Sequence, residues 1–153
     1  MSASSLTELG ERVLANIPLT RHLHFQLLEW DGASLTLSAP LAPNINDKGT
    51  FFAGSQSALL TLAGWACATL TGETVHAEVD VVAVRSSLEY KAPLAADARI
   101  TVSSDGAVRQ RFQQRLQRTG RASLTVSARL GDVEGNLAST FDATYMARAP
   151  GNL

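Results

Sequence analysis

A polar, turn-forming loop runs directly into a long apolar segment within residues 43–70. The loop contains Asn46 and Asp47, and the apolar segment begins with Gly54 and Ser55. Asp47 is the nearest carboxylate and therefore the candidate general base or nucleophile. A helix starting near Gly54 would leave its first backbone N–H groups without helical partners, in a field that favours negative charge. This order of residues could activate a nucleophile and stabilise an oxyanion.

The small and polar neighbours fit that chemistry, although a simpler interpretation exists. Gly54 lets a carbonyl group approach the backbone closely. Ser55 either adds a donor beside it or acts as the helix N-cap. Asn46 could position water or the carbonyl, and Thr50 could hold the loop. Because Asn, Asp and Gly are common turn formers, the loop could equally serve only to make turns.

The segment 52–70 is predicted to be a helix that is buried on most sides, and Gly72 is expected to end it in the left-handed conformation. Its apolar residues surround the helix axis, which is typical of a core helix. At a rise of about 1.5 Å per residue it would span roughly 28 Å. A membrane-spanning helix is the alternative, but Gln56, Thr61 and several other polar residues interrupt the apolar run.

The rest of the chain is mostly strand pattern. A helix is expected over 5–16, with Ser5 and Glu8 as a capping box. The spacing of Val108, Phe112 and Leu116 predicts a second helix over 107–117. Alternating residues predict strands at 25–30, 34–39, 78–90, 98–103, 121–130 and 137–145. The first two should form a hairpin around Asp31 and Gly32, and the strand over 78–90 should have one continuous face from Val82 to Tyr90. Because only the helix over 52–70 could cover an antiparallel sheet, we predict an α+β hotdog fold, a curved antiparallel sheet wrapped around one long central helix.

Composition bounds the class of protein. The length of 153 residues predicts a single domain over 1–153, with loose termini at about 1–4 and 149–153. A net charge of −1 gives no case for a nucleic acid or membrane partner. A single cysteine, Cys67, and the lack of a secretory signal at the N-terminus favour a cytoplasmic protein. Cys67 lies mid-helix and is expected to be a small buried hydrophobe rather than a catalytic thiol.

Residues 44–70 read NINDKGTFFAGSQSALLTLAGWACATL, and this run resembles a known family, the hotdog putative thioesterases whose domain also occurs fused to GNAT acetyltransferases. Asp47 stands where that family often has a histidine, and Ala53 where it often has a glycine. Two later runs, SSLEYKAPL and GRASLTVSARL, are similar to the family's long strands. The residues that carry the resemblance are Asn44, Asn46, Gly49, Thr50, Phe52, Gly54, Ser55, Ala63, Gly64 and Trp65.

The resemblance implies hydrolysis of an acyl-CoA or acyl-carrier-protein thioester with no cofactor. The chemistry of the residues themselves predicts catalytic roles for Asn46, Asp47, Gly54 and Ser55, and no metal site is expected. The resemblance also implies a homodimer or a tetramer, in which part of the long strand faces the partner. The expected substrate-binding residues are Asn44, Thr50, Phe52, Gln56, Arg85, Ser86 and Ser87.

Several features keep other functions open. Many hotdog thioesterases carry an acidic residue on the central helix, whereas this chain has none there before Glu73. A non-catalytic acyl-CoA-binding or assembly domain is therefore the main alternative. Hotdog dehydratases depend on a histidine in the loop, and this loop has none. The three histidines also lack metal-ligand spacing. The arginines between 109 and 121 indicate a solvated helix face or a contact with coenzyme A phosphates.

Overall fold

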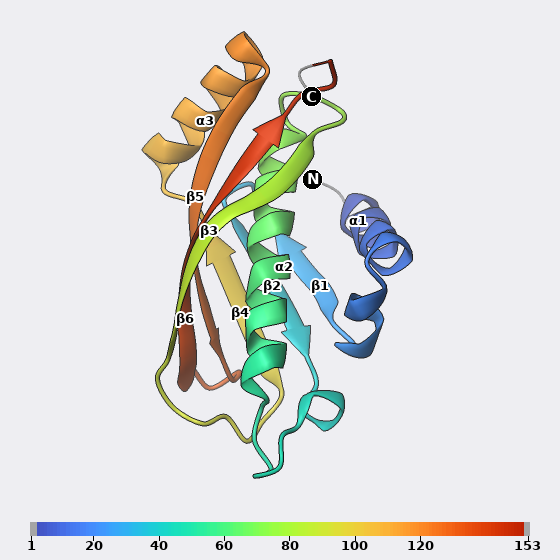
Figure 1. Cartoon of the computed structure of the whole chain (residues 1–153), viewed down its shortest axis with the longest axis vertical. Helices are drawn as coiled ribbons and strands as arrows, with labels where there is room; N and C mark the ends of the chain where they lie inside the picture. The colour runs from blue at the N-terminus through green and yellow to red at the C-terminus, as the bar shows by residue number, and fades with distance from the viewer. Residues whose placement is uncertain (1–2, 152–153) are drawn as a thin grey trace.

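A six-stranded antiparallel sheet curves around one long helix in the computed structural model, which describes residues 3–151 (Figure 1). The sheet order is β1-β2-β4-β5-β6-β3. Its strands are β1 (Gln26–Trp30), β2 (Ser34–Ala39), β3 (Asp80–Tyr90), β4 (Ala98–Ser103), β5 (Arg121–Gly131) and β6 (Leu137–Arg148). The helices are α1 (Ala3–Asn16), α2 (Ala53–Gly72) and α3 (Gly106–Thr119), with two 3-10 helices, η1 (Pro18–His22) and η2 (Ala42–Asn44). This is the architecture predicted for a hotdog fold.

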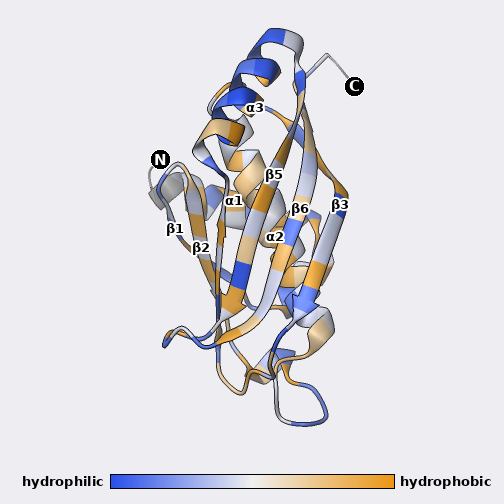
Figure 2. Cartoon of the chain, turned by 90° about the vertical axis from the view of Figure 1, so that its left-hand side faces the viewer, coloured by the Kyte–Doolittle hydropathy of each residue, from blue (hydrophilic) through white to orange (hydrophobic). Residues whose placement is uncertain are grey.

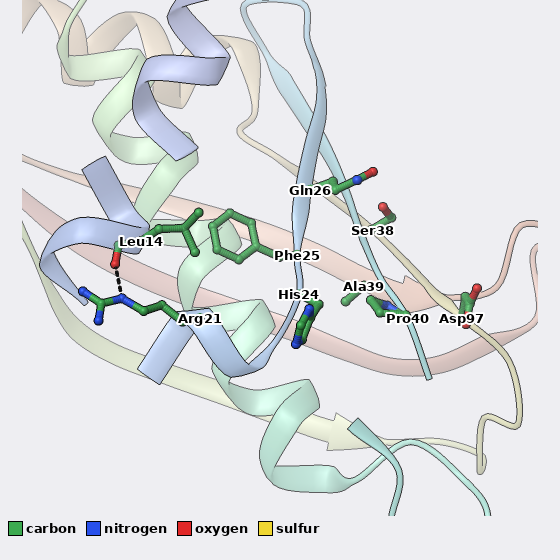
Figure 3. A pocket seen from close by; sticks show the side chains of 9 residues that line it. All are labelled: Leu14, Arg21, His24, Phe25, Gln26, Ser38, Ala39, Pro40 and Asp97. Atoms are coloured by element: carbon green, nitrogen blue, oxygen red, sulfur yellow. Dashed lines mark hydrogen bonds between the residues drawn. The ribbon is translucent and has the colours of Figure 1, made fainter. Parts of the chain in front are cut away.

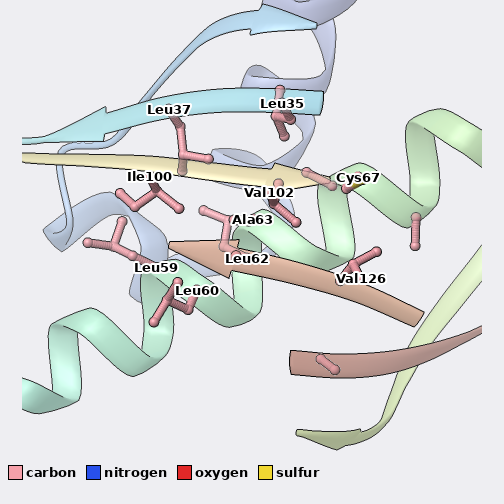
Figure 4. Close-up of a cluster of buried hydrophobic side chains, with 14 of the residues drawn as sticks. Leu35, Leu37, Leu59, Leu60, Leu62, Ala63, Cys67, Ile100, Val102 and Val126 are labelled. Atoms are coloured by element: carbon pink, nitrogen blue, oxygen red, sulfur yellow. The ribbon is translucent and has the colours of Figure 1, made fainter. Parts of the chain in front are cut away.

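The core lies between α2 and the concave face of the sheet. Leu59, Leu60 and Ala63 of α2 are fully buried against inward-facing side chains such as Leu37 and Ile100 (Figure 4). Each fully buried aliphatic side chain contributes roughly 1.5–3 kcal/mol. Because α2 is held on most sides, the residues at its N-terminus are attached to a rigid element.

The Ala63-Gly64-Trp65 run ties α2 to two strands. The Tyr145 ring of β6 packs on Gly64 so closely that an added Cβ would lie 2.6 Å from the ring Cε2 atom. The Tyr145 hydroxyl donates to the Thr61 carbonyl at 2.9 Å. The Trp65 indole N–H donates to the Val81 carbonyl of β3 at 3.1 Å. Residues 63–65, which are part of the family-like motif, therefore have a structural role in joining α2 to β3 and β6.

β3 is an edge strand that pairs only with β6 among the described residues. A bulge between Ala83 and Arg85 shifts its register. The sequence pattern predicted one continuous face from Val82 to Tyr90, and the bulge makes that prediction wrong. Val82 and Val84 are 44% and 52% exposed, whereas Ala83 lies opposite the buried Tyr145. An alternation rule cannot place the extra residue that a bulge inserts.

Two predicted helix signals are also wrong. α1 already includes Ala3, so Ser5 lies inside the helix and not at its N-cap. Gly72, expected as a left-handed stop, is helical, and Glu73 is the C-cap. Gly72 instead allows close packing, since an added Cβ there would lie 3.2 Å from a Val79 methyl. A left-handed glycine does end α3, at Gly120 with φ 76°.

The expected loose ends are shorter than predicted in the described part of the chain. Ala149 is buried, and its N–H donates to the Gly120 carbonyl at 2.8 Å. The prediction for residues 1, 2, 152 and 153 lies outside the described residues.

Candidate functional site

The loop before α2 is a closed turn held by Asn46. Its base is a bridge between Ile45 and Phe51. The Asn46 side-chain oxygen accepts from the N–H groups of Lys48 at 2.9 Å and Thr50 at 3.0 Å. Its side-chain amide donates to the Thr50 hydroxyl at 2.8 Å. Asn46 and Thr50 therefore fix the shape of the loop, and both polar ends of Asn46 are used within it.

Asn44 anchors this loop to the body of the protein. Its side chain is buried, and its amide donates to the carbonyls of Leu23 and Pro40, each at 2.9 Å. Its own carbonyl accepts from the Phe52 N–H at 2.8 Å. The structure thus places Asn44 beneath the loop, where it positions the start of α2 and presents no side chain to the surface.

The N-terminus of α2 has no side-chain cap. Phe52 is the N-cap residue, and the first helical hydrogen bond runs from the Gln56 N–H to its carbonyl at 3.0 Å. Within residues 3–151, the N–H groups of Ala53, Gly54 and Ser55 have no acceptor. Ser55 is inside the first turn, so the N-cap interpretation of Ser55 is wrong. These donors lie at the positive end of a 20-residue helix and can receive a carbonyl oxygen.

Gln56 and Phe52 flank these donors on opposite sides. Gln56 is 4% exposed, and its amide donates to the Phe51 carbonyl at 3.1 Å. Its Oε1 atom is buried without a partner among the described residues. Gln56 therefore supports the loop from the protein interior. Phe52 is 52% exposed, and its ring packs against Gly54 on the outside.

Asp47 lies at the exposed tip of the loop. Its side chain is 81% exposed and pairs with the Lys48 ammonium at 3.0 Å. No hydrogen bond joins it to the first turn of α2 in the part of the chain described. The structure thus places Asp47 in the same loop as Asn46 and Thr50, but apart from the free N–H groups.

β3 meets this end of α2 through one residue that the sequence did not indicate. The Tyr90 hydroxyl donates to the Ala53 carbonyl at 3.0 Å. Arg85, Ser86 and Ser87 lie further back on the same strand, and Ser86 is paired with the buried Ala143. They are not brought into contact with the loop within this chain. No local signal distinguishes Tyr90 from other strand aromatics, because its partner is 37 positions away in the sequence.

A surface cavity of about 830 Å³ lies beside β1 and β2 and contains His24, Ser38 and Asp97 (Figure 3). Its polar groups serve the local structure. Asp97 accepts from the Leu41 N–H at 2.8 Å, and Arg21 donates to the Leu14 carbonyl at 2.6 Å. Figure 3 shows that His24, Ser38 and Asp97 do not converge on one point. This cavity offers no catalytic arrangement.

Other candidate groups lie away from the loop. Cys67 is buried, as expected, and burial raises the pKa of its thiol to about 12, so it is a neutral thiol near pH 7. Within residues 3–151, no group of three His, Cys, Asp or Glu residues could hold a metal ion. None of the described helices is long and apolar enough to cross a membrane.

The arginines of α3 lie at the opposite end of the central helix. Figure 2 shows α3 as a largely hydrophilic helix. Its Leu116 packs beside Gly72, whereas Gly54 lies near the other end of α2, roughly 27 Å away by the helix rise. Arg109 is used locally, donating to the Ser104 carbonyl at 2.9 Å. Arginines of α3 therefore cannot contact a group bound directly at Gly54 of the same chain.

An antiparallel sheet curved around one buried helix is the hotdog architecture. A protein of unknown function from Chlorobaculum tepidum has a TM-score of 0.85 and 23% identity, over 95% of this chain and 94% of that one. A putative thioesterase from Shewanella oneidensis has a TM-score of 0.82 and 27% identity, over 97% and 100%. A probable thioesterase from Pseudomonas aeruginosa has a TM-score of 0.77 and 21% identity, over 93% and 95%.

The family itself follows from the sequence match. Residues 6–149 match the family described as Putative thioesterase (yiiD_Cterm), and the chain belongs to this family. A search of curated proteins gave no match.

Proposed function

We propose that this protein hydrolyses an acyl thioester whose thiol is coenzyme A or an acyl carrier protein. The observation that carries the proposal is the set of N–H groups at Ala53, Gly54 and Ser55, which have no acceptor within residues 3–151 and lie beside the half-exposed ring of Phe52. Membership of a thioesterase family supports the same reaction.

In the proposed reaction, the thioester oxygen accepts hydrogen bonds from the N–H groups of Gly54 and Ser55. Water attacks the carbonyl carbon, and the resulting oxyanion is stabilised by these donors and by the helix dipole. The C–S bond then breaks, and the sulfur leaves as a thiolate that takes up a proton. The reaction requires no cofactor.

Asp47 is the proposed base that accepts the proton from water. An exposed ion pair such as that with Lys48 contributes only about 0–1 kcal/mol, so it can break when a substrate binds. The loop that carries Asp47 is fixed by Asn46, which limits the positions its carboxylate can reach.

Turnover of an acyl-CoA panel, followed with a thiol-reactive dye, tests the proposal. Asp47→Ala should lower kcat/KM at least about 100-fold if Asp47 is the base. Lys48→Ala removes the ion pair but keeps the carboxylate, and should leave kcat/KM within about threefold because the pair is weak. Full activity of Asp47→Ala would remove Asp47 from this role.

We also propose a homodimer, or a tetramer built from it, that pairs through β3. This edge strand has 11 residues and exposes Val82 and Val84. The contact between Tyr90 and Ala53 places the end of β3 at the start of α2, so a second copy on β3 would lie beside the site. Arg85, Ser86 and Ser87 are then the residues closest to the partner. Light scattering should give at least twice the 16.2 kDa chain mass, and a monomer at micromolar concentration would contradict the proposal.

One observation favours a second function, non-catalytic binding of an acyl-CoA. Asp47 is exposed and has no described contact with the first turn of α2, so the backbone donors there have no adjacent base. Coenzyme A binding without turnover of any substrate in the panel would favour non-catalytic binding over hydrolysis. A dehydratase is less well supported, because no described contact brings a histidine to the start of α2.

A further inference from the structure

We infer that an apolar groove along α2 binds the hydrocarbon tail of a straight-chain acyl group of about 12 to 14 carbons. The inference rests on the thioesterase function proposed above and names its substrate class. The groove has a volume of about 290 Å³ and is distinct from the cavity of about 830 Å³ beside β1.

The groove starts at Ala58, about one helical turn beyond the proposed carbonyl site at Gly54. Ala58, Thr61 and Trp65 line it, and they follow Gly54 at spacings of four, seven and eleven residues. These spacings place all four residues on one face of a helix. Gly54 and the groove therefore lie along one stripe of α2. The Phe52 ring packs against Gly54 and is 52% exposed, so it must move outward for a carbonyl followed by a hydrocarbon chain to occupy this stripe.

The walls of the groove suit a hydrocarbon. η1 contributes Leu19 on one side, and Ala83 of β3 and Tyr145 of β6 contribute on the other. Figure 1 shows η1 and β3 on opposite sides of α2. Leu19 is 65% exposed, so in the isolated chain this wall remains open to water. Covering that surface with a hydrocarbon chain is favourable, at roughly 0.8 kcal/mol per buried methylene.

The length of the groove and its volume predict the same number of carbons in the acyl chain. From Gly54 to Trp65 the helix rises about 16 Å. An extended chain advances about 1.2 Å per bond, as three backbone bonds span 3.3–3.6 Å in a peptide, so roughly 13 bonds fit. The groove volume of about 290 Å³ holds about ten methylenes at roughly 30 Å³ each, the volume of one water molecule. Four further carbons cover the roughly 6 Å between Gly54 and Ala58.

The first test compares kcat/KM for straight-chain acyl-CoAs from 4 to 18 carbons. We expect a maximum at 12 to 14 carbons, at least tenfold above both ends of the series. Thr61→Phe blocks the groove about 10 Å from Gly54, so the ratio of kcat/KM for dodecanoyl over hexanoyl should fall at least tenfold. Thr101→Phe makes the same chemical change on the outer face of β4 and should keep the wild-type ratio.

The second test does not depend on hydrolysis. Trp65 lines the groove, and the only other tryptophan, Trp30, is a buried residue of β1. Dodecanoate carrying bromine at carbon 12 should quench Trp65 fluorescence, because the heavy atom lies beside the indole. The four-carbon 4-bromobutanoate should not reach it. In Trp65→Phe the quenching should disappear.

The outcomes separate the two proposals. Hydrolysis with a flat chain-length profile, or an unchanged ratio in a folded Thr61→Phe variant, would overturn the groove inference and leave the hydrolase function standing. Quenching of Trp65 without turnover would overturn hydrolysis and support the groove. Equal quenching in wild type and Trp65→Phe, or none in either, would overturn the groove even if Thr61→Phe fails to fold.

Discussion

Replacing Gly54 by alanine tests the proposed oxyanion site with the smallest possible change. The backbone N–H of Gly54 is retained, but a methyl group is added beside it. That methyl would lie 2.9 Å from the Cζ atom of the Phe52 ring. Since Phe52 is 52% exposed, its ring can move outward, and the methyl and the displaced ring then occupy the approach to the donors.

The substitution is expected to have a large effect on catalysis and a small effect on stability. Removing one oxyanion donor in a hydrolase costs about 100- to 1,000-fold in kcat, or about 2.7–4 kcal/mol, and blocking access to it should cost at least about 100-fold. Alanine is better than glycine inside a helix by about 0.8–1.0 kcal/mol, which offsets the displacement of Phe52. The melting temperature should therefore change by less than about 4 °C.

The assay pairs kcat/KM for dodecanoyl-CoA with thermal unfolding of the same samples. Gly10→Ala is the matched control, because Gly10 lies inside α1 and an added Cβ would be 3.9 Å from Leu27, an ordinary contact. That variant should be slightly stabilised and fully active. If Gly54→Ala is folded and keeps kcat/KM within about threefold of wild type, the start of α2 does not hold the oxyanion and the reasoning fails.

Two further predictions concern the buried side of α2. Gly64→Ala should lower the free energy of unfolding by about 1–3 kcal/mol, measured in urea, because overpacking against Tyr145 exceeds the gain in helix propensity; an unchanged urea midpoint would contradict it. Cys67 should react with a thiol reagent at pH 8 only after denaturation. Burial raises the pKa of the Cys67 thiol from 9.0 to about 12. The contribution of the neutral thiol to the free energy of unfolding is therefore complete below pH 9 and is lost as the pH rises towards 12. The fall in unfolding free energy above pH 9 should therefore be smaller in Cys67→Ala, and identical slopes would refute this.

The parts of the fold that local chemistry determines were predictable. The helix expected over 52–70 is observed as α2 (Ala53–Gly72), because an apolar run of that length has few alternatives. The hairpin around Asp31 and Gly32 is observed, and the Asp31 carboxylate accepts from the N–H groups of Ala33 and Ser34 at 2.8 and 2.7 Å. Turn residues of this kind form their contacts within a few positions.

Roles that depend on distant partners were not predictable. Asn44 was expected to contact substrate, and it binds the carbonyl of Leu23, 21 positions earlier. Gln56 was also expected to bind substrate, and it is buried and donates to the Phe51 carbonyl. In both cases the polar side chain satisfies a backbone group that only the folded chain brings near. The roles proposed for Asn46, Asp47, Gly54 and Ser55 remain predictions.

The two long helices that follow loops in this chain start differently, and the difference bears on function. At the start of α3, the Asp105 carboxylate accepts from the N–H groups of Ala107 and Val108 at 3.1 and 3.2 Å. The corresponding N–H groups of α2 belong to Gly54 and Ser55, and Phe52 has no side-chain acceptor for them. A polar N-cap is typically worth about 1 kcal/mol, so α2 forgoes a stabilisation that α3 has. The start of α2 therefore lacks the polar N-cap that local stability favours. In a family of putative thioesterases, this absence is expected where the backbone donors are kept free for a ligand.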